Sequence, residues 1–155
     1  MIKTGFTRQI LPTILLSACL VSSAMAAEPV HLITREEAGL PAVEPRPGSV
    51  RNLTRGPGID TLGTPAKVGS GPFRLAVRFM PSNGVPIEPD SVRIIYRRNP
   101  AIDLTARVKP FITAAGIEAP AVVVPPGKHV VEIEATDKEG RTGRSQFTLT
   151  VEPPK

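Results

Sequence analysis

The chain of 155 residues contains no tryptophan, one tyrosine and one cysteine, and aromatic residues make up only 4% of it. Sugar-binding surfaces usually present tryptophan and tyrosine rings, so this scarcity argues against a carbohydrate-binding face. Nucleic-acid surfaces combine a dense basic face with aromatic stacking platforms. Here basic residues alternate with acids along the expected strands, and we predict that the chain does not bind nucleic acid.

The sequence also lacks a nucleophile elbow, a glycine-rich phosphate loop and a box of metal ligands. Neither His31 nor His129 has a second ligand at a metal-binding spacing. We expect the His129 ring at the surface or against the neighbouring proline rings. Asp137 and Glu139 share a polar loop, but a lysine and an arginine in it would repel a calcium ion. We therefore predict no catalytic residue, no cofactor and no metal, and a protein that is not an enzyme.

The N-terminus has the features of an export signal. Lys3 and Arg8 form a positive region, residues 10–21 are apolar, and residues 24–26 read Ala-Met-Ala, a small-x-small cleavage site. The apolar stretch is too short and too interrupted for a membrane span, and no second one follows. We predict a signal peptide over residues 1–26, cleavage between Ala26 and Ala27, and a periplasmic or secreted chain without a transmembrane segment.

Residues 16–19 read Leu-Ser-Ala-Cys, which resembles the lipobox of bacterial lipoproteins. The alternative to cleavage after Ala26 is therefore a chain anchored by a lipid on Cys19. Cleavage after Ala26 leaves no cysteine, and hence no disulfide and no thiol chemistry. It also removes two basic residues and no acid, so the net charge falls from +5 to +3. The remainder suffices for one domain with a single core.

Residues 27–56 are rich in proline and glycine, which leaves no room for a long helix or a central strand. We interpret them as an extended, partly disordered leader. Within it, Thr34 and Glu37 have capping-box spacing and could start one helical turn that ends at Gly39. The apolar residues 30–33 leave a second possibility open, pairing at a sheet edge or docking a partner.

From residue 57 to residue 152, strand signals recur at the spacing of a β-sandwich. The clearest alternation of apolar and polar residues is in residues 73–79, 91–97, 130–135 and 145–151. Glu132 and Glu134 share a strand face that we interpret as solvated. Residues 104–108 fit either a short helix capped by Asp103 or a strand. The expected fold is all-β, an antiparallel two-sheet sandwich with a tail at residues 153–155.

Residues 59–152 resemble an immunoglobulin-like or fibronectin-III-like module of exported bacterial proteins. The resemblance rests on Pro-Gly-Lys-His at 126–129 before a strand, Ala-Thr-Asp at 135–137, Gly-Arg at 140–141 and a final alternating strand. The chain departs from antibody domains, because it has no core tryptophan and no cysteine pair, and Tyr96 lies in a middle strand. The resemblance implies an adhesive, spacer or accessory role and assigns no active site.

Five arginines on the outward faces of two strands are the candidate interaction surface: Arg74, Arg78, Arg93, Arg97 and Arg98. Neighbouring strands would unite them in one positive patch, whereas strands in facing sheets would divide them between two surfaces. We predict a non-catalytic structural or binding module that presents loops or a sheet edge to an envelope protein or cell-surface component. The alternative is an accessory domain of an enzyme that acts on cell-wall or polysaccharide material.

Overall fold

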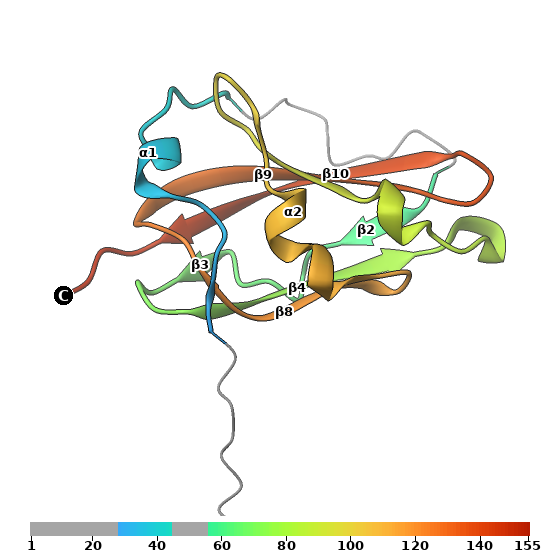
Figure 1. The fold of residues 1–155 in the computed structure, drawn as a ribbon, viewed down its shortest axis with the longest axis horizontal. Coiled ribbons are helices and arrows are strands. Elements are labelled where there is room, and N and C mark those ends of the chain that lie inside the picture. Colours follow the sequence, from blue (N-terminus) through green and yellow to red (C-terminus); the bar gives the residue numbers. More distant parts are fainter. Residues whose placement is uncertain (1–27, 45–55) are drawn as a thin grey trace, which may run out of the picture.

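The computed structural model describes residues 28–44 and 56–155. Two β-sheets pack face to face along the length of the molecule (Figure 1). The predicted export signal, the Ala26–Ala27 cleavage site and Cys19 lie outside the described residues. No helix within the described ranges is long and apolar enough to cross a membrane.

One sheet has the order β1-β8-β4-β2, with β7 also paired to β8, and the other has the order β3-β10-β9-β5-β6. The central strands are long and the edge strands are short, which limits the backbone edge exposed to unwanted pairing. The strands are β1 (Val30–His31), β2 (Gly58–Asp60), β3 (Lys67–Val68), β4 (Phe73–Met80), β5 (Arg93–Tyr96), β6 (Ile102–Asp103), β7 (Ile112–Thr113), β8 (Gly116–Val123), β9 (Gly127–Thr136) and β10 (Thr142–Val151).

The helices are all single turns. They are α1 (Arg35–Ala38) and α2 (Thr105–Val108), with 3-10 turns η1 (Ser82–Gly84), η2 (Pro89–Ser91) and η3 (Lys109–Phe111). For α1 the capping box is present as predicted, and the turn ends at Gly39. The choice left open for residues 104–108 is resolved as a helix over Thr105–Val108. Its N-cap is Leu104 rather than the expected Asp103, which ends β6, although the Asp103 carboxylate accepts a hydrogen bond from the Thr105 N–H at 2.8 Å. Pro110 follows at once in η3, so the helix cannot lengthen.

Alternating strand residues form the core as predicted. The alternation in residues 73–79, 91–97, 130–135 and 145–151 predicts ten inward side chains, and eight of them are buried: Leu75, Val77, Phe79, Val92, Ile94, Ile133, Leu149 and Val151. The other two, Phe73 and Phe147, are partly buried and pack against that core. The prediction of an all-β two-sheet sandwich is confirmed.

The sheets are mixed, which corrects the expectation of purely antiparallel pairing. β1 runs parallel to β8, and β3 runs parallel to β10. Each of these edge strands is only two residues long and lies at the end of its sheet. Such short additions extend the sheets locally, and the antiparallel pairs still make up most of each ladder.

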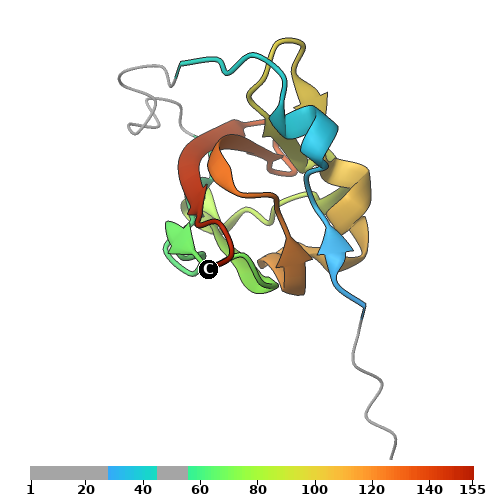
Figure 2. The ribbon, with the colours of Figure 1, turned by 90° about the vertical axis from the view of Figure 1, so that its left-hand side faces the viewer.

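Residues 30–33 pair at a sheet edge, which is the second of the two possibilities that the sequence leaves open for the leader. Val30 and His31 pair with β8, and the Leu32 N–H donates to the Val123 carbonyl at 3.0 Å. Leu32 and Ile33 are each only 2% exposed and belong to the core. Figure 2, seen along the sandwich, shows this segment passing beside α2 before it enters α1. A short run of apolar residues is enough to attach this segment to the domain, because the edge of β8 supplies backbone hydrogen-bond partners there.

Candidate functional site

The structure divides the five candidate arginines between the sheets. Arg74 and Arg78 lie on β4 and Arg93 lies on β5, while Arg97 and Arg98 follow β5 directly. β4 and β5 belong to different sheets, so the residues do not form one positive patch. The second of the two arrangements considered from the sequence is therefore the observed one.

Two of these five arginines are also paired with acids. Arg74 Nη2 lies 2.7 Å from Glu118 Oε2 on the neighbouring strand. Arg97 Nη1 lies 3.8 Å from Glu132 Oε2, in a part-buried position. A second acid on β9, Glu134, is the register partner of both Arg93 and Arg144 and binds the latter at 2.6 Å. Glu132 and Glu134 are thus both part-buried, and each lies in an ion pair with an arginine.

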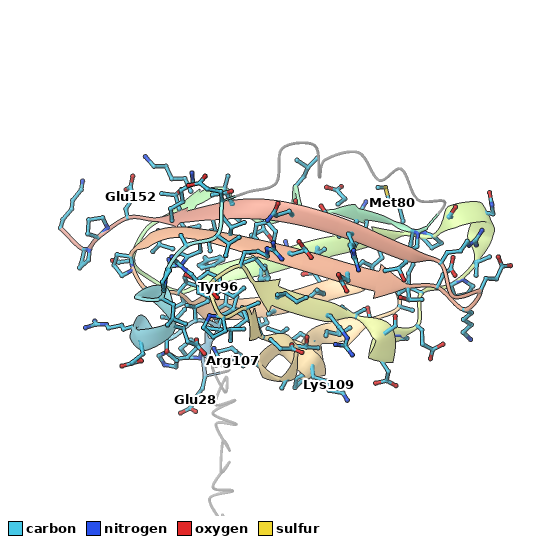
Figure 3. All side chains as sticks on the ribbon, turned by 90° about the horizontal axis from the view of Figure 1, so that it is seen from above. Glu28, Met80, Tyr96, Arg107, Lys109 and Glu152 are labelled. Atoms are coloured by element: carbon cyan, nitrogen blue, oxygen red, sulfur yellow. The ribbon has the colours of Figure 1, made fainter. Side chains whose placement is uncertain are left out.

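Arg98 occupies a different environment, a buried polar cluster made with Tyr96 and His129. The Tyr96 hydroxyl lies 2.7 Å from His129 Nδ1, and Arg98 Nε donates to the same hydroxyl at 2.7 Å. His129 Nε2 lies 2.8 Å from the Pro125 carbonyl oxygen. The Arg98 guanidinium also lies over the Tyr96 ring, 4.9 Å from its centroid. Figure 3 shows Tyr96 near the α1 end of the molecule.

Burial corrects the expectation for His129, whose ring was placed at the surface or against the Pro125 and Pro126 rings. His129 is 1% exposed and Tyr96 is fully buried. Burial lowers the pKa of His129 from its ordinary value of 6.5, and the positive charge of Arg98 lowers it further. Burial likewise raises the pKa of Tyr96. Both rings are therefore neutral at physiological pH, as their hydrogen bonds require.

An open groove of about 460 Å³ lies at the same end of the sandwich. We call it the end groove. Four segments enclose it: β1 with α1, the loop between β3 and β4, the β8–β9 link and the C-terminal tail. The lining residues are His31, Ile33, Thr34, Arg35, Glu36, Ser70, Val123, Val124, Pro125, Pro126 and Pro154.

The floor of the end groove is apolar and its rim is polar. Ile33 and Val124 are buried beneath it, whereas Ser70, Pro126 and Pro154 are exposed. Proline rings have fixed backbone φ angles, so a proline-lined wall loses little conformational entropy when something binds against it. His31, Ser70 and Glu36 all line the groove, but no hydrogen bond joins the His31 ring to Ser70 or Glu36 among the described contacts.

The loop at the opposite end of β9 is a closed polar turn, as the sequence reading favoured. The Asp137 carboxylate accepts hydrogen bonds from the Glu139 and Arg141 N–H groups and from Arg141 Nε. Although burial opposes ionisation, these bonds lower the pKa of Asp137. With its oxygens engaged in this way, the loop is not arranged for calcium. No cluster of three or more His, Cys, Asp or Glu side chains is placed to share a metal ion in the part of the chain that the structure describes.

The sequence contained a signal for the buried polar cluster that the analysis of single motifs missed. Val131, Ile133 and Ala135 point inward from β9, and His129 continues that alternation. In residues 91–97, Tyr96 shares a strand face with the apolar Val92 and Ile94. Two polar rings on inward faces require a partner for each polar atom, but the sequence does not show that the two rings meet.

Comparisons with known proteins give one informative match. No family model matches the chain, and no curated protein is similar to it. Among solved structures, the fold is similar to CopC from Methylosinus trichosporium OB3b, with 16% sequence identity and a TM-score of 0.43. The match covers 64% of this chain and 96% of that chain. It is a likeness of fold alone.

Proposed function

We propose that this chain is an exported, non-catalytic binding module whose end groove holds an extended apolar segment of an envelope protein. The observation that carries the proposal is the end groove itself, with a proline wall above a buried aliphatic floor. Ligand sites of this kind are concave and mostly apolar, with a few polar groups that set orientation. Ser70, Thr34 and His31 supply those groups at the rim.

The composition of the end groove favours a peptide over a sugar. No aromatic ring other than the His31 imidazole lines it, whereas sugar sites rely on stacking against large rings. Among the described residues that line the groove, no hydrogen bond joins the Ser70 hydroxyl to the His31 imidazole as a nucleophile to a base, which supports a binding role there. An immunoglobulin-like or fibronectin-III-like assignment fits such a role, because these modules present loops at the ends of the sandwich.

Site-specific photocrosslinking tests the groove. A photoreactive residue at Ser70 should crosslink one envelope protein through an apolar segment, identified by mass spectrometry of the joined peptide. The same residue at Lys138, in the loop at the far end of β9, is the matched control. A synthetic peptide of the captured segment should bind the purified mature chain. Ser70→Trp should weaken that binding more than about tenfold, while Lys138→Trp should not. Equal capture at both positions, or a captured polar polymer, would refute the proposal.

Export is tested separately by intact mass of the protein from the cell envelope. We propose a mature chain that begins at Ala27 in the periplasm or outside the cell. A mass that corresponds to a diacylglyceryl-modified Cys19 would replace this with a lipid-anchored form. Cys19→Ala would then release the protein from membranes.

A further inference from the structure

The buried polar cluster matches its donors and acceptors in only one protonation state. The Pro125 carbonyl oxygen can only accept, so His129 Nε2 must carry a hydrogen. Arg98 Nε can only donate, so the Tyr96 oxygen accepts from it. The Tyr96 hydrogen therefore points to His129 Nδ1, which must be unprotonated. This fixes the histidine as the neutral tautomer with its hydrogen on Nε2.

Adding a proton to Nδ1 disrupts this arrangement. The hydroxyl hydrogen and the new Nδ1 hydrogen would face each other across a contact of 2.7 Å. The hydroxyl could turn to accept from Nδ1, but its own hydrogen would then need another acceptor around a fully buried side chain. Leaving a buried donor without an acceptor costs about 1–3 kcal/mol.

The charges around the ring also oppose protonation. Arg98, at the end of β5, places its guanidinium on the same hydroxyl. On β9 itself the adjacent Lys128 is exposed. Glu37 of α1, the acid whose charge acts on Tyr96, already holds Arg107 of α2 in an ion pair of 2.6 Å. No free carboxylate among these packed groups is placed to receive the new positive charge.

The cluster joins the end groove to the leader. His129 holds the carbonyl of Pro125, whose residue lines the groove. Arg98 Nη1 donates to the Leu40 carbonyl at 3.0 Å and Nη2 donates to the Lys128 carbonyl at 3.3 Å. Nearby, the Val43 N–H donates to the Arg97 carbonyl and the Asn99 N–H donates to the Pro41 carbonyl. A change at His129 therefore acts on the groove wall and on residues 40–43 together.

We propose that protonation of His129 breaks its contact with Tyr96, displaces the ring that holds the Pro125 carbonyl and so loosens the wall of the end groove. The module then holds its partner at neutral pH and releases it in acid. This regulation rests on the proposed function of the groove, but the structural change occurs in the free protein. The lowered pKa of His129 agrees with a folded state that resists this protonation.

Nuclear magnetic resonance of the free mature chain tests the change without any ligand. At about pH 7.5 the imidazole nitrogen shifts should show hydrogen on Nε2 alone. On acidification, the carbonyl carbon of Pro125 should shift with the same midpoint as His129. The amides of Val43 and Asn99 should exchange at least about tenfold faster, after correction for intrinsic rates, below that midpoint than above it. His31→Gln, which removes the other imidazole of the mature chain, should leave all these responses unchanged.

Two variants separate the cluster from general acid sensitivity. Tyr96→Phe removes the hydroxyl that conflicts with a protonated Nδ1, so the Pro125 response should shrink. His129→Gln removes the titrating ring and should abolish it. If these variants fail to fold, the titration of the unmodified protein tests the proposal by itself. A hydrogen on Nδ1 at neutral pH, or a Pro125 carbonyl that ignores the His129 midpoint, overturns the proposal. A groove that binds no peptide while these shifts occur refutes only the proposed function.

Discussion

Glu37 and Arg107 lie 70 residues apart in the sequence and meet in a two-pronged ion pair, with Arg107 Nη2 at 2.6 Å from Oε1 and Nη1 at 2.8 Å from Oε2. Arg107 Nη1 also donates to the Leu32 carbonyl at 2.7 Å. The leader is thereby joined to α2 through charge-assisted hydrogen bonds as well as through its apolar residues. Figure 3 shows Arg107 on the side of the molecule where this contact forms.

This ion pair predicts a loss of stability when it is cut. The hydrogen bonds from Arg107 lower the pKa of Glu37 to about 2. Glu37→Gln should reduce the free energy of unfolding by about 1–3 kcal/mol in urea titrations, because part-buried bonds to a charged group are lost. The matched control is Glu152→Gln in the exposed pair with Lys67, which should cost less than about 1 kcal/mol. Equal losses would mean that the leader contact contributes no more than a surface pair.

Truncation of a single leader side chain tests whether the leader belongs to the core. Leu32→Ala should lower the free energy of unfolding by about 2–5 kcal/mol, because it leaves a cavity among buried residues. Leu62→Ala is the control, since Leu62 is 90% exposed, and it should change stability by less than about 0.5 kcal/mol. Chemical denaturation of both variants measures these two changes in the free energy of unfolding. A Leu32→Ala variant as stable as the parent protein would mean that the leader does not contribute to the core.

The pairing of β4 with β8 requires glycine at position 116. A Cβ atom there would overlap the Val77 carbonyl oxygen. Gly116→Ala should therefore destabilise the fold by about 1–3 kcal/mol or more, measured by thermal unfolding. For comparison, a Cβ at Gly71 meets nothing within 4 Å, so Gly71→Ala should be close to neutral. Similar melting temperatures for both variants would argue against the stated register of these two strands.

His129 predicts a pH dependence of stability with a defined sign. Its pKa is lowered in the folded state from the ordinary value of 6.5, so the unfolded chain binds the proton more readily. The contribution of neutral His129 is complete above that value and is lost as the pH falls below it. Melting temperatures should decline on this account from about pH 6.5 downward, well above the range in which Glu37 protonates.

Matched variants assign that decline to one ring. His31→Gln should retain the decline, because His31 is exposed. His129→Gln should lose the part of it that begins near the ordinary histidine value. A decline that survives in His129→Gln and disappears in His31→Gln would reverse the assignment.

Local patterns in the sequence determined the framework of this protein. Alternation identified the strands β4, β5, β9 and β10 and eight buried core residues, because a strand places successive side chains on opposite faces. It did not identify β8, which is equally central to its sheet. Capping chemistry placed the turn of α1, since Thr34 and Glu37 satisfy each other's backbone N–H groups within one turn. The edge strands β1 and β3 are two residues long, too short for an alternation to appear. Their parallel pairing depends on an edge supplied by a distant strand.

Only the tertiary structure decided how the polar residues are used. The sequence placed five arginines on strand faces, but the sheet topology separated them and set the half-buried Arg98 against Tyr96. It placed His129 at the start of a strand, whereas its partners Tyr96 and Pro125 come from β5 and the β8–β9 link. The end groove likewise arises from four segments that no local pattern relates. Steric preferences and local hydrogen bonds depend on neighbouring residues, so they can be predicted from the sequence. The burial of a charge or a ring depends instead on distant segments that meet only when the two sheets pack against each other.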